Sequence, residues 1–150
     1  MTPAVDAAKR AGVAFELHEY DGVELGEGDY GVGVAHALGR PPGQLFKTLV
    51  ATTEGRLAVF VVPADRQLDL RRIGKRSSLA AKAEAERATG YVLGGISPLG
   101  QRKRLPTTVD ESALEWETIL VSAGRRGLQI ELAPADLVRI TGATVTAIAV

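Results

Sequence analysis

The sequence contains no cysteine, only two histidines and equal numbers of basic and acidic residues, so it has no net charge. Without cysteine the chain can form no disulfide bond, no thiolate nucleophile and no zinc site built on sulfur. With His18 and His36 as the only histidines, a histidine-rich metal centre is not expected either. We therefore predict a protein without a metal or a cofactor.

The sequence also has no apolar run long enough to span a bilayer. Its first residues reach the charged Asp6 and Lys9 without the apolar stretch of a secretory signal, so we expect a cytoplasmic protein with no membrane partner. A chain of 150 residues, of which 45% are hydrophobic and 24% charged, has the size and composition of one compact domain. We predict a single domain over residues 1–150.

Because eighteen basic residues balance eighteen acidic ones, no overall field attracts the protein to long polyanions such as DNA. The basic residues are nevertheless clustered at 71–76, 102–104 and 125–126. A local basic face of this kind can hold the end of a nucleic acid, whereas a wide electrostatic footprint is not expected.

Hydrophobic periodicity and turn residues predict a mixture of short helices and strands. Helices are expected where a capping residue precedes helix formers, at 2–12, 32–38, 69–73, 78–88 and 134–140. Strands are expected where apolar residues alternate or run together between turns, at 13–18, 45–53, 57–62, 91–96, 118–122, 128–132 and 144–150. The glycine-rich segment 21–33 is expected to be a loop. Hairpins and helical connections together predict an α/β fold with a strongly curved mixed β-sheet flanked by short helices.

The segment Gly90–Asp110 contains four of the seventeen glycines, two of the seven prolines and the second basic cluster. The pair Gly94-Gly95 lacks the Cβ atoms that would hold a ligand away from the backbone, so we expect amide groups that donate at close range. Ser97-Pro98 stiffens the segment, because proline fixes its own φ and biases the residue before it toward extended geometry. The combination predicts a rigid pocket wall beside a cationic lip, with a solvated glycine-rich hairpin as the alternative.

Four polar side chains outside this segment are further candidates. Lys47 lies in an apolar strand segment, where a lysine either extends to solvent or directs its ammonium into a cleft to hold a phosphate, a ribose oxygen or a carbonyl. Tyr20 is either an ordinary amphipathic ring at a strand end or, together with Tyr30, part of a stacking wall for a base or sugar, and Tyr30 is otherwise a cover over the core. Ser122 follows an apolar strand without the pattern of a nucleophile turn, so we interpret it as a hydroxyl donor. The sequence shows no nucleophile with a base, no paired acids and no metal cluster.

Several blocks of the sequence resemble one known family. These blocks are Met1–Val5, Phe46–Leu49, Gly90–Gly100, Leu105–Thr107 and Val121–Leu128. They run from end to end of the chain and are similar to the YbaK/EbsC family of aminoacyl-tRNA deacylases, in particular its free-standing Cys-tRNA(Pro) deacylases. This family is related to the editing domain of prolyl-tRNA synthetase, and the resemblance implies a mixed α/β fold with a curved sheet.

The resemblance also implies an enzyme that removes cysteine from mischarged Cys-tRNA(Pro), with Cys-tRNA(Cys) as a further substrate. In this family the substrate thiol is thought to attack its own ester and to form a thiolactone, a lyase-type step with net hydrolysis. The protein would then supply orientation and charge stabilisation rather than a nucleophile. The implied partners are the 3′ end of an aminoacyl-tRNA and, as a candidate, prolyl-tRNA synthetase.

By position, the resemblance implies that Lys47 holds the ribose or phosphate of the terminal adenosine and that Gly94 lines the ester. The residues expected to bind substrate are Tyr20, Tyr30, Gly95, Ser97, Ser122 and Gln129. Gln129 stands where the free-standing Cys-tRNA(Pro) deacylases of the family have aspartate, so a fixed anion is not expected there and the amino-acid preference stays open. The alternatives are a deacylase for another small residue, such as Ala-tRNA(Pro), and a non-catalytic module that binds a tRNA end or a synthetase.

Overall fold

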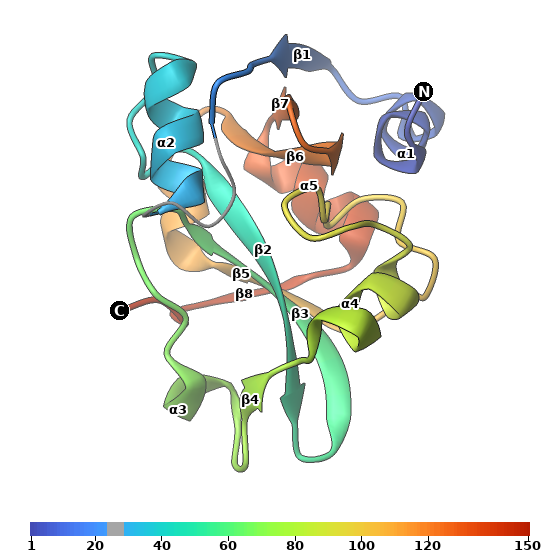
Figure 1. Cartoon of the computed structure of the whole chain (residues 1–150), viewed down its shortest axis with the longest axis vertical. Helices are drawn as coiled ribbons and strands as arrows, with labels where there is room; N and C mark the ends of the chain where they lie inside the picture. Colours follow the sequence, from blue (N-terminus) through green and yellow to red (C-terminus); the bar gives the residue numbers. More distant parts are fainter. Residues whose placement is uncertain (24–28) are drawn as a thin grey trace.

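The computed structural model describes residues 1–23 and 29–150, in which short helices and strands alternate (Figure 1). The helices are α1 (Pro3–Ala11), α2 (Tyr30–Ala37), α3 (Leu70–Ile73), α4 (Lys82–Thr89), the 3₁₀ helix η1 (Glu111–Glu115) and α5 (Pro134–Thr141). The strands are β1 (Phe15–Glu19), β2 (Phe46–Thr53), β3 (Arg56–Pro63), β4 (Ser78–Leu79), β5 (Thr107–Asp110), β6 (Ile119–Arg125), β7 (Leu128–Leu132) and β8 (Thr144–Thr146). None of these helices is long and apolar enough to cross a membrane. The expected mixed α/β class is confirmed.

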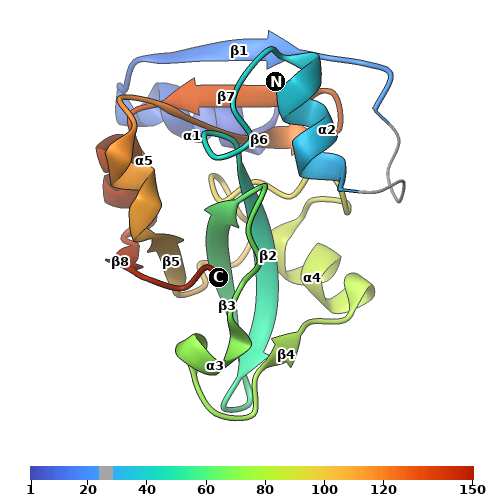
Figure 2. The same cartoon turned by 90° about the vertical axis from the view of Figure 1, so that its left-hand side faces the viewer.

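The strands are divided between two sheets rather than joined in one. The first sheet is antiparallel with the order β1-β7-β6, and the second is mixed with the order β4-β2-β3-β5-β8. A parallel bridge between Leu45 and Leu120 connects them where β2 begins beside β6. Figure 2 shows the first sheet at one end of the molecule and the β2–β3 hairpin running from there to the other end.

The main hydrophobic cluster joins both sheets to the flanking helices. Its largest fully buried side chains include Phe46, Leu99, Ile119, Ile130, Leu132 and Leu137. α1 contributes Ala4, Val5 and Ala8, whose helical spacing places them on one buried face. The hydroxyl of Thr2 caps this helix by accepting from the Val5 N–H at 3.2 Å. The core therefore fixes the positions of β2, β6 and β7, which meet at the cavity described below.

Most of the predicted helices and the β2–β3 and β6–β7 hairpins are confirmed, but the prediction of a strand at 91–96 is wrong. This segment forms turns, because Gly94 has a φ of +88° and the backbone bonds locally rather than to a neighbouring strand. The predicted helix at 78–88 begins only at Lys82, since Ser78–Leu79 pair with β2 as strand β4.

The remaining differences are one strand that was not predicted and one shifted helix start. Strand β5 was not predicted, because four residues give too short an alternation to be recognised. α2 begins at Tyr30 rather than 32, where the Asp29 side chain accepts from the Val32 N–H at 3.4 Å. Of the loop predicted over 21–33, residues 24–28 lie outside the described residues.

Candidate active site

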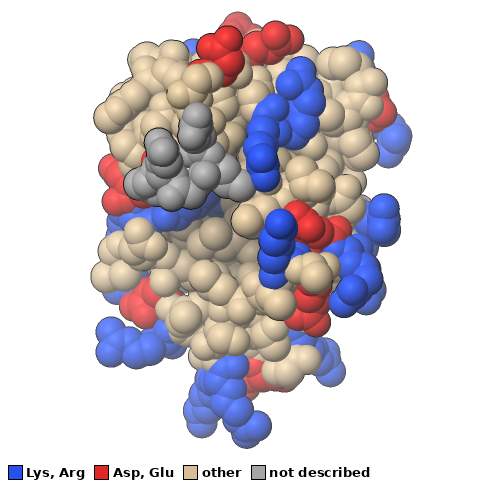
Figure 3. Space-filling model, viewed as in Figure 1, with Lys and Arg blue, Asp and Glu red and all other residues tan. Residues whose placement is uncertain are grey.

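A cavity of about 380 Å³ lies between α2, the start of β2, the segment after α4 and the β6–β7 hairpin. The face in Figure 3 is hollowed where α2 and β2 lie side by side in Figure 1. Much of the lining is apolar, from Val34, Leu45, Phe46, Leu49, Leu93 and Ile96. Five candidates from the sequence also line it, namely Tyr30, Lys47, Gly94, Ser122 and Gln129. Tertiary folding thus brings together residues from four separate stretches of the chain.

Lys47 is the second residue of β2 and pairs in register with Val62 of β3. Its side chain is half-buried and lies at the cavity wall. None of the ion pairs formed by the described residues involves this ammonium group. A cation that is partly withdrawn from water and pairs with no acid of the described residues is available to an anionic or carbonyl group of a ligand.

A tight turn over residues 92–95 carries Gly94 to the opposite wall. Leu93 within this turn is held from two sides, because its N–H donates to Glu86 Oε2 at 2.7 Å and its carbonyl accepts from Arg126 Nε at 3.0 Å. The positive φ of Gly94 is one that glycine adopts without strain. The turn is therefore fixed between α4 and the β6–β7 hairpin, with the Gly94 backbone at the cavity.

The structure places Gly95 and Ser97 outside the cavity lining. A Cβ atom on Gly95 would lie 2.7 Å from Arg125 Cα, so this glycine allows close backbone packing, and its N–H is already bonded to the Val92 carbonyl at 2.9 Å. Ser97 is fully buried, and its hydroxyl accepts from the Leu99 N–H at 3.2 Å. Both residues make structural contacts within the protein.

Tyr20 lies behind the wall rather than in it, and its hydroxyl forms a hydrogen bond of 2.9 Å with that of Tyr30. Burial, together with this hydrogen bond, raises the pKa of Tyr30 well above its usual value. Tyr30 therefore stays protonated, and Tyr20 fixes the position of its hydroxyl.

Two residues that line the cavity each have a buried side-chain oxygen with no hydrogen-bond partner among the described residues, Thr48 Oγ1 and Gln129 Oε1. Gln129 is 4% exposed and pairs in register with Ser122, whose hydroxyl accepts from the Gly124 N–H at 3.2 Å. An unpaired buried polar atom costs about 1–3 kcal/mol, and such atoms in native proteins call for a ligand, a water or an ion. Sequence reasoning missed Thr48. These two unused acceptors are themselves buried, so a ligand in the cavity reaches them only if the wall shifts.

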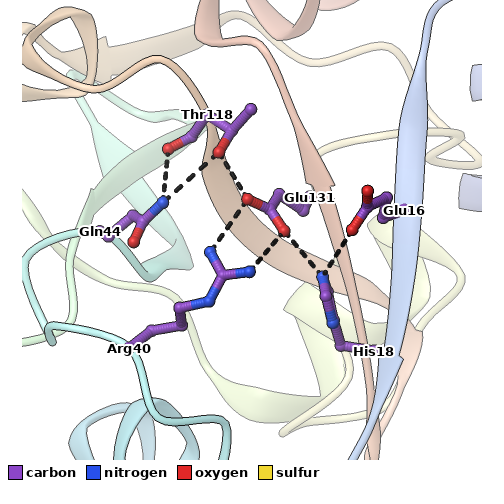
Figure 4. Close-up of polar contacts among 6 residues, drawn as sticks. All are labelled: Glu16, His18, Arg40, Gln44, Thr118 and Glu131. Atoms are coloured by element: carbon purple, nitrogen blue, oxygen red, sulfur yellow. Dashed lines mark hydrogen bonds and ion pairs between the residues drawn. The ribbon is translucent and has the colours of Figure 1, made fainter.

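A polar cluster next to the cavity is a clamp rather than a metal site (Figure 4). Ligand atoms of Glu16, His18 and Glu131 lie within 4.8 Å of one another. However, both oxygens of Glu131 accept from the Arg40 guanidinium at 2.9 Å, and its Oε1 contacts His18 Nε2 at 2.8 Å. The bond from Arg40 is the main reason that the pKa of Glu131 falls to about 2. The cluster thereby ties the link between α2 and β2 to the first sheet.

Comparison with known proteins gives a consistent result. Residues 32–140 match the family of aminoacyl-tRNA editing domains. The chain is 40% identical over 114 residues, 72% of this chain and 70% of the relative, to a protein of Enterococcus faecalis named as a Cys-tRNA(Pro)/Cys-tRNA(Cys) deacylase, EbsC. It is 32% identical over 117 residues, 71% of this chain and 70% of the relative, to the multifunctional Ser/Thr-tRNA deacylase ProXp-y of Escherichia coli. A crystal structure described as a trans-editing enzyme for prolyl-tRNA synthetase superposes with a TM-score of 0.84 and 25% identity, over 99% of this chain and 95% of the other.

Proposed function

This chain belongs to the aminoacyl-tRNA editing domain family, and we propose that it is a trans-editing deacylase that removes cysteine from mischarged Cys-tRNA(Pro), with Cys-tRNA(Cys) as a further substrate. The observation that carries the proposal is the arrangement of one cation, one backbone turn and two unused acceptors around a single largely apolar cavity. Such a cavity suits a small amino acid attached to a nucleotide.

The cavity supplies binding groups rather than a nucleophile. Its described lining contains no cysteine and no histidine, and the hydroxyl of Ser122 contacts a backbone N–H rather than a base. In the proposed reaction the cysteine sulfur of the substrate attacks the carbonyl carbon of its own ester. The new carbon–sulfur bond replaces the bond to the ribose oxygen, which leaves with the thiol proton, and water later opens the resulting thiolactone to cysteine.

Two groups of the protein are assigned to this step. The ammonium of Lys47 holds the ribose or phosphate of the terminal adenosine. The N–H of Gly94 has no acceptor among the described backbone bonds, and it donates to the ester carbonyl as negative charge develops on the oxygen. Removal of one such donor typically costs about 10²–10³ in rate.

The two unused acceptors support a second candidate reaction, the release of serine or threonine. The Escherichia coli relative is named for this activity, and a substrate hydroxyl would donate to Thr48 Oγ1 or Gln129 Oε1. Water rather than the substrate side chain would then attack the ester. The side chain of alanine has no donor, so these acceptors do not favour Ala-tRNA(Pro).

The test is a deacylation panel with Cys-, Ser-, Thr- and Ala-charged tRNA, using the native protein, Lys47→Ala and the exposed control Lys75→Ala. We expect cysteine release to fall at least about 100-fold in Lys47→Ala and to stay unchanged in Lys75→Ala, with native circular dichroism in both. Blocking the substrate thiol should stop release. Turnover that survives the block would indicate attack by water, and tight tRNA binding without ester loss would indicate a non-catalytic module.

A further inference from the structure

A second cavity of about 380 Å³ lies beyond the segment that follows α4. It is bounded by the end of α1, residues 98–105 and the end of α5. Apolar side chains form part of it, including Leu99, Leu105 and Ile140. Its lining, among the residues described, contains no acid and four cations, which are Arg10, Lys103, Arg104 and Arg139. We refer to this cavity as the basic groove.

Three of these cations have no partner in the ion pairs of the described residues, and only Arg139 contacts an acid, Asp136 at 3.7 Å. Cations at helix ends are common because they interact with terminal carbonyl groups. Arg10 lies in the last turn of α1, and a Cβ atom on Gly142 after α5 would lie 3.0 Å from Arg104 Nη2. Interaction with a helix end explains the position of each cation separately. It does not explain why four like charges share one cavity, because their mutual repulsion is unfavourable unless an anion binds between them.

The groove adjoins the candidate active site through a single loop. Ile96 lines the active-site cavity and Pro98 lines the basic groove. Two residues span at most about 7 Å of extended chain, so only a thin wall of loop separates the two sites. Gly94 on one side and Lys103 on the other both belong to this segment, which explains why the sequence places its glycine pair and its basic triplet so close together.

We infer that the basic groove binds the phosphodiester backbone of the acceptor arm of tRNA, an inference that rests on the proposed function. Exposed guanidinium and ammonium groups at the rim match phosphates, and the apolar floor matches ribose and base surfaces. Because the chain has no net charge, its affinity for a polyanion depends on a local site of this kind. On the face in Figure 3, basic side chains project from the right-hand edge, on the side where α1 lies in Figure 1.

The test compares two variants that lose the same charge. The groove variant is Arg10→Gln/Lys103→Gln/Arg104→Gln, and the control is Arg71→Gln/Lys75→Gln/Arg76→Gln, whose residues are exposed and lie outside both cavities. Fluorescence anisotropy measures binding of uncharged tRNA(Pro) from about 50 to 200 mM salt. Three lost phosphate contacts lower the slope of log affinity against log salt by roughly 2–3, which equals about a 16- to 64-fold difference in affinity over this range. The control should retain the native slope.

A second measurement separates the groove from the active site. With a cysteinyl-CCA trinucleotide, which lacks the acceptor stem, the groove variant should match the native rate, whereas with full Cys-tRNA its KM should rise and its kcat stay unchanged. An unchanged salt slope, or an equal fall in the control, overturns the inference. An equal loss on the trinucleotide does so too, because it would show that the cavity itself was altered. The anisotropy measurement uses uncharged tRNA, so it tests phosphate binding in the basic groove even if the protein does not catalyse the proposed deacylation.

Discussion

Replacement of Glu131 by glutamine removes the charge at the centre of the clamp while keeping the shape of the side chain. The native carboxylate is 11% exposed and accepts two bonds of 2.9 Å from Arg40. In Glu131→Gln one of these two acceptors becomes an amide NH₂, which faces the guanidinium donor. Arg40, 29% exposed, then loses the one carboxylate of the described residues with which it forms an ion pair.

The magnitude follows from the pKa of Glu131, which falls from 4.5 to about 2 on folding. Each unit corresponds to about 1.4 kcal/mol, so the ionised carboxylate contributes roughly 3 kcal/mol to the free energy of unfolding at neutral pH. For a chain of this size we expect the Tm of Glu131→Gln to fall by roughly 6–12 °C at pH 7.

The pH dependence has a defined sign. A carboxyl group whose pKa is lowered on folding stabilises the protein above its unfolded pKa, and this contribution is lost as the pH falls through the folded value. The free energy of unfolding of the native protein should therefore exceed that of Glu131→Gln by a constant amount above about pH 5.5. The two free energies should converge between there and about pH 2.

Urea unfolding followed by circular dichroism at several pH values measures this difference. The control is Glu16→Gln, because Glu16 is 76% exposed and lies 3.9 Å from His18 Nε2, so its loss should cost less than about 0.5 kcal/mol. Two results would refute the stabilising role of the Glu131 clamp. One is a decrease in the free energy of unfolding below about 1 kcal/mol in Glu131→Gln, and the other is a difference between native protein and variant that does not become smaller at acidic pH.

Two further substitutions test the role of Thr48 at the cavity and the close backbone packing at Gly95. Thr48→Val should change the free energy of unfolding by less than about 1 kcal/mol, because Thr48 Oγ1 has no partner to lose, yet it should lower kcat/KM about tenfold if that oxygen binds substrate. Urea unfolding and deacylation, measured on the same preparation, check the expected stability and the expected activity. An unchanged kcat/KM would contradict a role of Thr48 Oγ1 in substrate binding. Gly95→Ala should destabilise the fold by roughly 1–3 kcal/mol, because the new Cβ would lie 2.7 Å from Arg125 Cα. Gly43→Ala is the matched control, since its nearest contact would be 3.6 Å from Trp116, and thermal melts of equal midpoint would disprove the close-packing argument.

Local signals in the sequence were sufficient for several elements. The capping residue Thr2 fixes the start of α1, and the alternation of apolar residues gives β1. The apolar runs on either side of Glu54-Gly55 give the β2–β3 hairpin. These predictions succeeded because caps, turns and periodicity depend on residues close together in the chain.

The same local reasoning failed where a distant partner decides the outcome. The apolar residues at 91–96 read as a strand, yet they form turns, because Gly94 has a positive φ and Arg126 of the β6–β7 hairpin binds the carbonyl of Leu93. Ser78–Leu79 read as helix, yet they pair with β2.

For the site, the sequence by itself determined the family resemblance and the residue types that gather at the cavity, Lys47 and Gly94 among them. Only the tertiary structure decided that Gly95 and Ser97 lie outside the cavity lining and that Thr48 and Gln129 keep oxygens with no partner among the described residues. It also decided that cations of α1, α5 and the loop share one groove. Hydrogen-bond pairing and charge proximity are properties of groups in space, and residues far apart in the chain acquire them only when the two sheets and their helices pack together.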